Sequence, residues 1–171
     1  MLDANQQWTL KQAEAVCEAV RDLNIYWVEE PTHPDDIESH VKLSRKISPM
    51  RVALGEHVPN RVMFRNFMAR GATHFVQADC TRLAGISEFI AVSLLARRYG
   101  LPVVPHVGDM GQIHQHLVLF NHVALGHEAL FLEYIPHMRE HFLHPAEVSD
   151  GRYRTPQEAG ISCDLKRGKH A

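Results

Sequence analysis

The sequence has little excess charge, no long apolar run and few cysteines, and each shortage removes a class of protein. Its 18 Lys and Arg nearly balance its 20 Asp and Glu, so no electrostatic argument favours a nucleic acid or an anionic membrane as a partner. The longest apolar runs, such as ISEFIAVSLLA, are short and broken by charge, which excludes a typical transmembrane helix. The N-terminus has no basic stretch followed by an apolar segment, so the sequence shows no signal-peptide pattern.

The three cysteines are odd in number and show no C-x-x-C spacing, which favours reduced thiols in a cytoplasmic protein. Histidine is abundant by contrast, with 13 in the chain. Because the histidine spacings are irregular, we interpret most of these residues as surface or loop positions rather than metal ligands. The remaining composition is that of a soluble globular chain long enough for one domain.

Glycine-rich nucleotide motifs are also missing, since neither a G-x-G-x-x-G turn nor a Walker-type phosphate loop occurs. The chain does contain β-prone runs that alternate with amphipathic segments, which indicates a parallel sheet with right-handed crossovers. The predicted strands are the first three residues, Ile25–Val28, Val52–Leu54, His74–Gln77, Leu101–Val104 and Leu130–Glu133. The predicted helices are Thr9–Asp22, Pro34–Ile47, Asn60–Arg70, Gly85–Tyr99 and Gln112–Ala124.

Polar residues end nearly every predicted strand, which fits a ring of strands better than an open sheet with its site at one switch point. We therefore predict an α/β fold in which residues 1–134 form an incomplete TIM-type (β/α) barrel domain. A complete eight-stranded barrel needs about 250 residues, so this chain should be short by about two βα units. Residues 135–171 read as a tail of turns and irregular structure that packs on the barrel.

Three acidic residues follow successive predicted strands at nearly constant spacing: Asp3, Glu29 and Glu56. Carboxylates held close together repel one another unless a cation neutralises them, and hard oxygen ligands favour Mg²⁺. Any one of these residues taken alone is better explained as a helix cap or a loop charge. Because three stand in register, we predict a metal site.

Asp79 and His106 continue the series at the ends of the next two predicted strands. An imidazole is a good acid or base near neutral pH, and a carboxylate on one ring nitrogen fixes its tautomer. Neighbouring strand ends would place these two side chains together. Glu133 ends the last predicted strand, where it is equally well explained as a substrate contact or as an exposed charge.

The segments DANQ, WVEEPTHPDD, GEH followed by NRVMF, QADCTRLAGISE, VPH and FLEY, in this order, resemble the enolase superfamily. Within it they are similar to the mandelate racemase subgroup, and most similar to acid-sugar dehydratases of the L-fuconate dehydratase type. The resemblance covers nearly the whole chain. It implies about strands 3 to 8 of the C-terminal barrel, without the N-terminal capping domain and the first two barrel strands.

The resemblance also implies roles for individual residues. It makes Asp3, Glu29 and Glu56 the Mg²⁺ ligands, His106 the catalytic acid/base and Asp79 its partner. The remaining implied site residues contact or support the substrate: Glu133, Asn5, His57 and Arg82. Glu30 is implied to support a ligand rather than to be one.

The chain departs from the family pattern in two ways. The segment VGDMGQIHQHL after His106 is poor in glycine and shorter than in fuconate dehydratases, which leaves the identity of the sugar open. The second departure concerns a catalytic lysine. The family carries a Lys-x-Lys motif on its second barrel strand, whose last lysine is the opposing acid/base, and no lysine here occupies such a position. The implied activity is Mg²⁺-dependent dehydration of a small aldonate, in which the C2 proton and the C3 hydroxyl leave to give a 2-keto-3-deoxy acid. We expect the 171-residue chain alone to have little or no turnover.

Two alternatives remain open at this point. The same fold and metal could serve a racemase or epimerase, because the sequence does not reveal whether the substrate has a hydroxyl in the position to be eliminated. The chain could also be a non-catalytic fragment with unpaired sheet edges. We expect the intact protein to be a homo-oligomer, and the balanced charge and short apolar runs predict no nucleic-acid or membrane partner.

Overall fold

The computed structural model describes residues 1–107 and 111–167. Short parallel strands alternate with helices along the first two thirds of the chain, and a small hairpin follows. The helices are α1 (Leu10–Ala19), α2 (Ile37–Lys46), α3 (Arg61–Ala69), α4 (Ile86–Arg98) and α5 (Ile113–Leu125), with 3₁₀ turns η1 (Arg21–Leu23) and η2 (Pro136–His141). The strands are β1 (Leu2–Asp3), β2 (Trp27–Glu29), β3 (Arg51–Leu54), β4 (Phe75–Val76), β5 (Val148–Ser149) and β6 (Arg152–Tyr153).

The first four strands form one parallel sheet in the order β1-β2-β3-β4. Its register pairs Asp3 with Glu29 and Glu29 with Ala53, so the carboxyl ends of the strands share one edge. A single parallel bridge from Val76 to Val103 extends the sheet by one more segment. This arrangement confirms the predicted α/β fold, in which successive strands are joined through helices.

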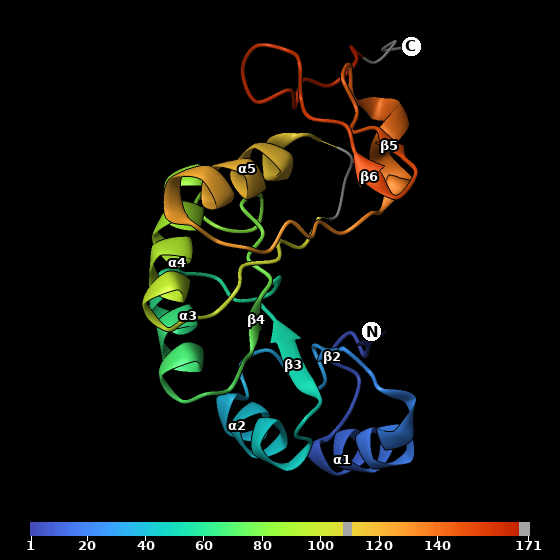
Figure 1. The fold of residues 1–171 in the computed structure, drawn as a ribbon, viewed down its shortest axis with the longest axis vertical. Coiled ribbons are helices and arrows are strands. Elements are labelled where there is room, and N and C mark those ends of the chain that lie inside the picture. Colours follow the sequence, from blue (N-terminus) through green and yellow to red (C-terminus); the bar gives the residue numbers. More distant parts are fainter. Residues whose placement is uncertain (108–110, 168–171) are drawn as a thin grey trace.

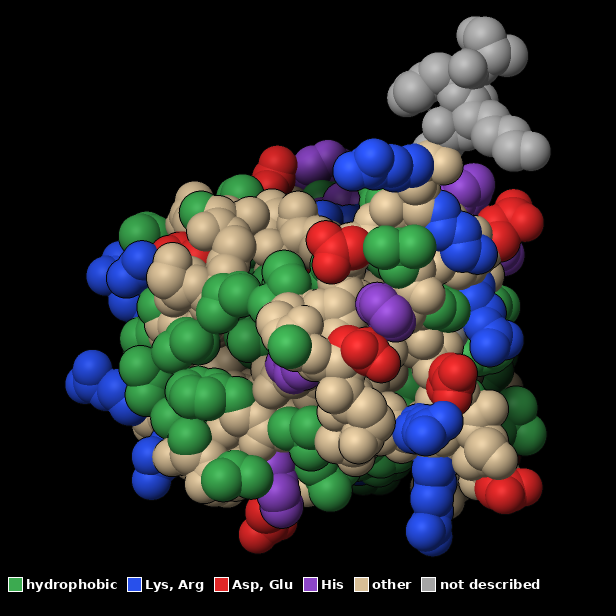
Figure 2. All heavy atoms as spheres, turned by 90° about the horizontal axis from the view of Figure 1, so that it is seen from above, with side chains coloured by type: hydrophobic (Ala, Val, Ile, Leu, Met, Phe, Trp, Pro, Cys, Tyr) green, Lys and Arg blue, Asp and Glu red, His purple; other side chains and the backbone are tan. Residues whose placement is uncertain are grey.

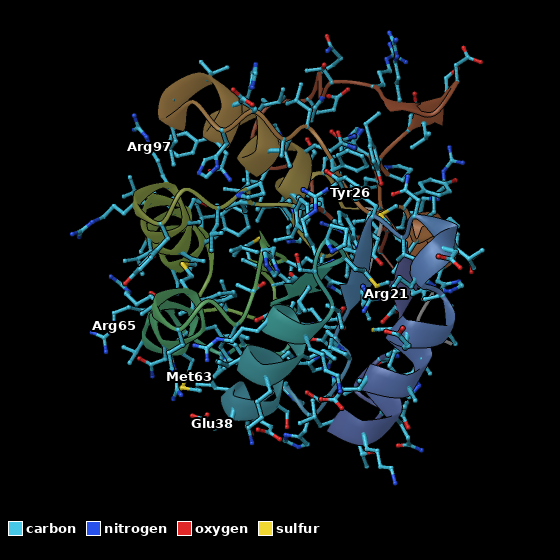
Figure 3. The ribbon with its side chains drawn as sticks, turned by 60° about the horizontal axis from the view of Figure 1, so that its bottom comes forward. Arg21, Tyr26, Glu38, Met63, Arg65 and Arg97 are labelled. Atoms are coloured by element: carbon cyan, nitrogen blue, oxygen red, sulfur yellow. The ribbon has the colours of Figure 1, made fainter. Side chains whose placement is uncertain are left out.

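The helices lie along the outer side of a curved row of strands, and the segment after α5 lies at one end of the molecule (Figure 1). Side chains such as Arg65 of α3 and Arg97 of α4 point away from the sheet (Figure 3). None of the described helices is long and apolar enough to cross a membrane.

Alternation along the strands divides the core into two layers. Val28, Val52 and Val76 face the helices and join the larger apolar cluster, which includes Phe64 and Phe89. The intervening residues point to the opposite face, since successive side chains of a strand alternate. They form a second, smaller cluster of Trp27, Ala53, Phe75 and Val104, which is what the inner layer of a barrel requires.

Local sequence signals explain where the helices begin. The Thr9 side chain accepts a hydrogen bond from the Gln12 backbone N–H. The Gln12 side-chain oxygen in turn accepts one from the Thr9 backbone N–H, which completes a capping box. Asn60 caps α3 by accepting the N–H groups of Val62 and Met63. The predicted start of the second helix at Pro34 was too early, because Asp36 is its N-cap.

Two predicted strands are wrong or only partly formed. Leu130–Glu133 pairs with no other strand among the described residues, and Leu101–Val104 is reduced to the bridge at Val103. These segments follow β4, the last strand of the sheet, and no further described strand offers them a second row of hydrogen bonds. Phe131 instead packs its ring 6.2 Å from that of Trp27, centroid to centroid.

The segment after residue 134 is more regular than predicted. It contains η2 and an antiparallel hairpin of β5 and β6, whereas we expected turns and irregular structure. Asp150 and Gly151 both have positive φ, 52° and 72°, as an Asp-Gly hairpin turn requires. The last four residues of the predicted tail lie outside the described residues.

Candidate active site

The polar residues predicted to share a site lie at one edge of the sheet. Asp3 and Glu29 are the last residues of β1 and β2, and Glu56 follows β3 by two positions. Asp79 and His106 each stand three residues beyond a position of the Val76–Val103 bridge. The carboxyl ends of parallel strands are where (β/α) barrels build their sites, because the loops there converge.

Asp79 and His106 form a buried pair. The His106 Nδ1 atom lies 2.7 Å from the Asp79 Oδ2 atom, and the two residues are only 4% and 1% exposed. Burial alone would raise the pKa of Asp79, but hydrogen bonds from His106, His114 and Thr81 outweigh it and hold the pKa far below its usual range. The carboxylate is therefore ionised and accepts a hydrogen bond from the Nδ1–H group of His106.

The other nitrogen of His106 faces two more carboxylates. Its Nε2 atom lies 3.4 Å from Glu56 Oε2 and 3.6 Å from Glu133 Oε2. Burial opposes protonation of His106, but the bond to Asp79 and the charges of Glu56 and Glu133 prevail and raise its pKa. The protonated imidazole is thus favoured, with one N–H held by Asp79 and the other available at the site.

Glu133 is held from two sides. The Val107 backbone N–H donates to Glu133 Oε2 at 3.0 Å, and the Tyr153 hydroxyl of the hairpin donates to the Glu133 backbone oxygen. Burial raises the pKa of the Glu133 carboxyl, and the neighbouring charges of Glu56 and Asp3 add to that effect. The structure therefore brings Glu133 to the site from a segment that forms no strand.

Glu29 is a buried carboxyl among other carboxyls. Burial raises its pKa to about 7, with further contributions from the charges of Asp3 and Glu133, although bonds from Gln77 and Trp27 oppose the shift. The Trp27 indole N–H donates to Glu29 Oε2 at 3.0 Å. The buried Oε1 atom of Gln77 has no hydrogen-bond partner among the described residues. An oxygen-rich site with crowded carboxylates suits a hard cation such as Mg²⁺.

The structure draws together one compact set of metal-type ligands among its described residues: Glu30, Glu56 and His57. Their ligand atoms lie within 4.8 Å of one another, and His57 Nδ1 is 2.9 Å from Glu30 Oε2 and 3.4 Å from Glu56 Oε1. Asp3 and Glu29 do not form such a set with Glu56. Glu30, which the resemblance implies to support a ligand, itself lies in this set.

The remaining predicted residues lie at the rim of the site. Arg82 Nη1 donates to Glu56 Oε1 at 2.9 Å and lies 3.4 Å from His57 Nε2. The Asn5 backbone N–H donates to Asp3 Oδ1 at 2.8 Å. Glu30 has a positive φ of 37°, a strained conformation for a side chain of its type that is often found at functional sites.

Several residues of the site escaped sequence reasoning. Gln6 donates to Glu30 Oε2 at 2.6 Å, and the backbone N–H and hydroxyl of Thr81 bind Asp79 Oδ1 at 2.8 and 2.7 Å. The Asp-x-Thr spacing of Asp79 and Thr81 is a recognisable Asx-turn signal. Gln6 and the buried His114 carry no such signal, because their partners are distant in the sequence. Most described histidines are at least partly exposed, but His40, His106, His114 and His127 are buried.

Comparison with known proteins assigns a family. Residues 1–169 match the family model described as enolase C-terminal domain-like. The L-galactonate dehydratase of Hypocrea jecorina is 41% identical over 170 residues, which are 97% of this chain and 38% of that protein. The chain therefore spans about two fifths of the length of this relative.

Solved structures agree with this assignment. The crystal structure of human mitochondrial enolase superfamily member 1 superposes with a TM-score of 0.88 at 33% identity, over 97% of this chain and 39% of that one. The L-talarate dehydratase of Polaromonas sp. JS666, solved in complex with Mg and L-glucarate, has a TM-score of 0.80 at 27% identity. That superposition covers 96% of this chain and 44% of the other.

Proposed function

The chain belongs to the enolase superfamily, and from this membership we propose that it supplies the metal-binding and His–Asp side of the active site of a Mg²⁺-dependent acid-sugar dehydratase. The observation that carries the proposal is the buried Asp79–His106 pair, whose free Nε2 faces Glu56 and Glu133 across 3.4 and 3.6 Å. An acid/base held beside a group of carboxylates is the arrangement that proton transfer next to a bound cation needs.

Asp3, Glu29 and Glu56 are the residues that would hold the cation. Mg²⁺ bound there supplies positive charge that stabilises the negative charge developing on the substrate carboxylate as the C2 proton leaves. Its positive charge would also favour the ionised form of Glu29, whose pKa is raised mainly by burial and further by the charges of Asp3 and Glu133. The Mg-bound talarate dehydratase supports this assignment, because its fold superposes on the present chain.

His106 would act on the leaving group. In the elimination the C2 proton would pass to a base opposite His106, which the family resemblance assigns to a lysine without a counterpart in this sequence. The C2–H electron pair would form the C2–C3 double bond, and the C3–O bond would break as the hydroxyl takes the Nε2 proton of His106 and leaves as water. The resulting enol then tautomerises to the 2-keto-3-deoxy acid. Asp79 keeps the imidazole oriented by accepting a hydrogen bond from its Nδ1–H, with 2.7 Å between Nδ1 and Oδ2. Glu133, held at the site by the Val107 backbone N–H, would contact the substrate carboxylate or the enediolate.

The substrate class follows from the family and from the named relatives. The relatives act, by their names, on L-galactonate and on L-talarate, which are small polyhydroxy acids. L-fuconate, the substrate type that the sequence motifs most resemble, is the 6-deoxy form of L-galactonate, so both present the same C2 and C3 centres. We therefore propose an aldonate with that configuration.

The test is Mg²⁺-dependent thermal stabilisation of the chain. At a free Mg²⁺ concentration about 100 times the dissociation constant, binding should stabilise the folded state by about 2.7 kcal/mol. The shift should shrink in Asp3→Asn, Glu29→Gln and Glu56→Gln. It should persist in Glu140→Gln, a matched control whose side chain is 82% exposed on the tail.

The rival ligand set makes this experiment decisive. If Glu30→Gln and His57→Asn abolish the Mg²⁺ shift while Asp3→Asn and Glu29→Gln leave it intact, the cation binds at the Glu30, Glu56 and His57 cluster instead. If the unmodified chain shows no shift at any Mg²⁺ concentration, the metal part of the proposal is wrong.

A further inference from the structure

The Asp79 carboxylate has a second histidine on its other oxygen. His114 Nε2 lies 3.0 Å from Asp79 Oδ1, while His106 Nδ1 lies 2.7 Å from Asp79 Oδ2. His114 is 1% exposed and belongs to α5, whereas His106 stands in the loop that follows Val104. The carboxylate is therefore clamped between imidazoles that come from two different parts of the fold.

We propose, resting on the function argued above, that His114 is a positioning residue for proton transfer. Its Nε2–H group donates a hydrogen bond to Asp79 Oδ1. This bond holds the carboxylate in the orientation in which Oδ2 accepts a hydrogen bond from the Nδ1–H of His106. The Nε2 atom of His106 then stays directed at Glu56 and Glu133.

The direction of the His114 bond follows from competition between two neighbours. The Cys80 backbone N–H lies 3.1 Å from His114 Nε2 and would make that atom an acceptor, whereas the Asp79 carboxylate requires a donor. The acceptor tautomer would set a lone pair against a charged carboxylate oxygen. It would also leave a proton on Nδ1, which is buried without a hydrogen-bond partner among the described residues. The charge-assisted bond to Asp79 is the stronger interaction, so Nε2 carries the proton.

Because His114 lies on a helix, its bond connects the Asp79 loop to a different element of the fold. The two bonds from Thr81 to Asp79 Oδ1 arise within one loop and move with it. His114 is anchored in the packed interface of α4 and α5, where its ring meets the edge of Phe89 at a centroid distance of 6.4 Å. The bond therefore fixes the loop carboxylate to a rigid element outside the loop, as a preorganised site requires.

Two substitutions separate positioning from simple packing. His114→Gln keeps an N–H donor at about the reach of Nε2, and its carbonyl oxygen can accept the Cys80 N–H. His114→Leu fills a similar volume without a donor. His116→Leu, two residues along the same helix and outside the Asp79 contacts, is the matched control for the loss of an imidazole.

The measurement is the tautomer and proton exchange of His106, read from long-range proton–nitrogen correlation spectra of the ¹⁵N-labelled chain. In the unmodified chain, in His114→Gln and in His116→Leu, the Nδ1 proton of His106 should be hydrogen-bonded and slow to exchange. In His114→Leu its exchange with water should accelerate about tenfold, the factor expected for the loss of one hydrogen bond. Unchanged exchange in a folded His114→Leu chain would overturn the proposal.

A second measurement tests the proposal on the unmodified chain and needs no variant. In the unmodified chain the ¹⁵N shifts of His114 itself should show a protonated Nε2, and a protonated Nδ1 with a bare Nε2 would equally overturn the proposal. Neither reading uses Mg²⁺, substrate or turnover. Failure of the dehydratase proposal would therefore appear in the Mg²⁺ titration, and failure of the His114 proposal in these spectra.

Discussion

At the scale of single residues, the balance between burial and charge decides how Glu29 behaves. The residue is 8% exposed and lies near Asp3 and Glu133, so its ionised form is disfavoured and its pKa reaches about 7. Such a group stabilises the fold only while it is protonated. A bound cation would reverse this preference, because its positive charge stabilises the ionised form of Glu29.

The pH dependence of stability should reveal this effect. Because the pKa of Glu29 is about 7 in the folded chain and near 4.5 when unfolded, the folded state binds more protons between these values. Stability due to Glu29 is therefore fully present below about pH 4.5 and is lost as the pH rises to about 7. In Mg²⁺-free buffer, Glu29→Gln should flatten the fall in melting temperature across this window, whereas Glu140→Gln should not. An unchanged slope in Glu29→Gln would contradict the assignment.

Sequence reasoning at this scale succeeded where partners follow neighbouring strands. Asp79 and His106 were expected to meet because both end adjacent strands, and they lie 2.7 Å apart. His114 could not be found in this way. Its distance from Asp79 depends on how α5 packs against α4, and the sequence pattern does not determine that packing.

At the scale of elements, the turn after β3 depends on Gly55. Its φ is +150°, and a Cβ atom added there would lie 2.7 Å from the Gln77 backbone carbon. The close approach brings the end of β3 against the end of β4, immediately before Glu56. Glycine is therefore required for this element to present Glu56 at the site.

Substitution of Gly55 should be costly in two ways. Gly55→Ala combines an unfavourable φ with a clash against backbone, so we expect a loss of about 2–4 kcal/mol in the free energy of unfolding and weaker Mg²⁺ binding. Gly71→Ala is the matched control, because its φ is also positive, +67°, but nothing lies within 4 Å of an added Cβ. It should cost about 1 kcal/mol and leave Mg²⁺ binding unchanged. Denaturant unfolding measures both, and equal losses would show that the contact with Gln77 is unimportant.

Elements were predicted best where local signals were strong. All five predicted helices exist, because apolar spacing and caps such as Thr9 and Asn60 act within a few residues. The strand expected at Leu130–Glu133 did not form, since a strand exists only through its neighbours. A β-prone run is therefore a weaker predictor than an amphipathic one.

At the scale of the whole molecule, the described sheet has open edges and uncovered apolar side chains. Tyr26 and Phe131, whose rings contact Trp27 of the inner cluster, are 43% and 51% exposed, and Leu130 is 58% exposed. Hydrophobic side chains also gather on the face seen in Figure 2, and Leu119, Phe120 and Val123 of α5 remain exposed. Surface of this kind is usually covered by further protein.

The 171-residue chain should therefore associate with itself. Open strand edges and apolar surface promote pairing between copies, so we expect an apparent mass above 19.5 kDa that increases with concentration. Light scattering after size exclusion measures this directly. A monodisperse species of 19.5 kDa at every concentration would contradict the expectation.

Catalysis is also decided at this scale. Removal of the C2 proton needs a base opposite His106, and the family resemblance implies a lysine of a Lys-x-Lys motif that these 171 residues do not contain. We therefore expect the chain alone to give no measurable 2-keto-3-deoxy acid from a panel that includes L-fuconate and L-galactonate in Mg²⁺. Strong turnover would refute this. Exchange of the C2 proton for deuterium without product would instead favour the racemase or epimerase alternative.

The sequence alone determined the alternation of strands and helices, the family and the polar residues at the strand ends. These features are local or repeat along the chain, so periodicity and motifs carry them. Only the tertiary structure decided which strand ends converge, because that depends on packing between distant segments. It brought Glu30 and His57 to Glu56, turned Glu133 to the site without a strand, and placed His114 behind Asp79.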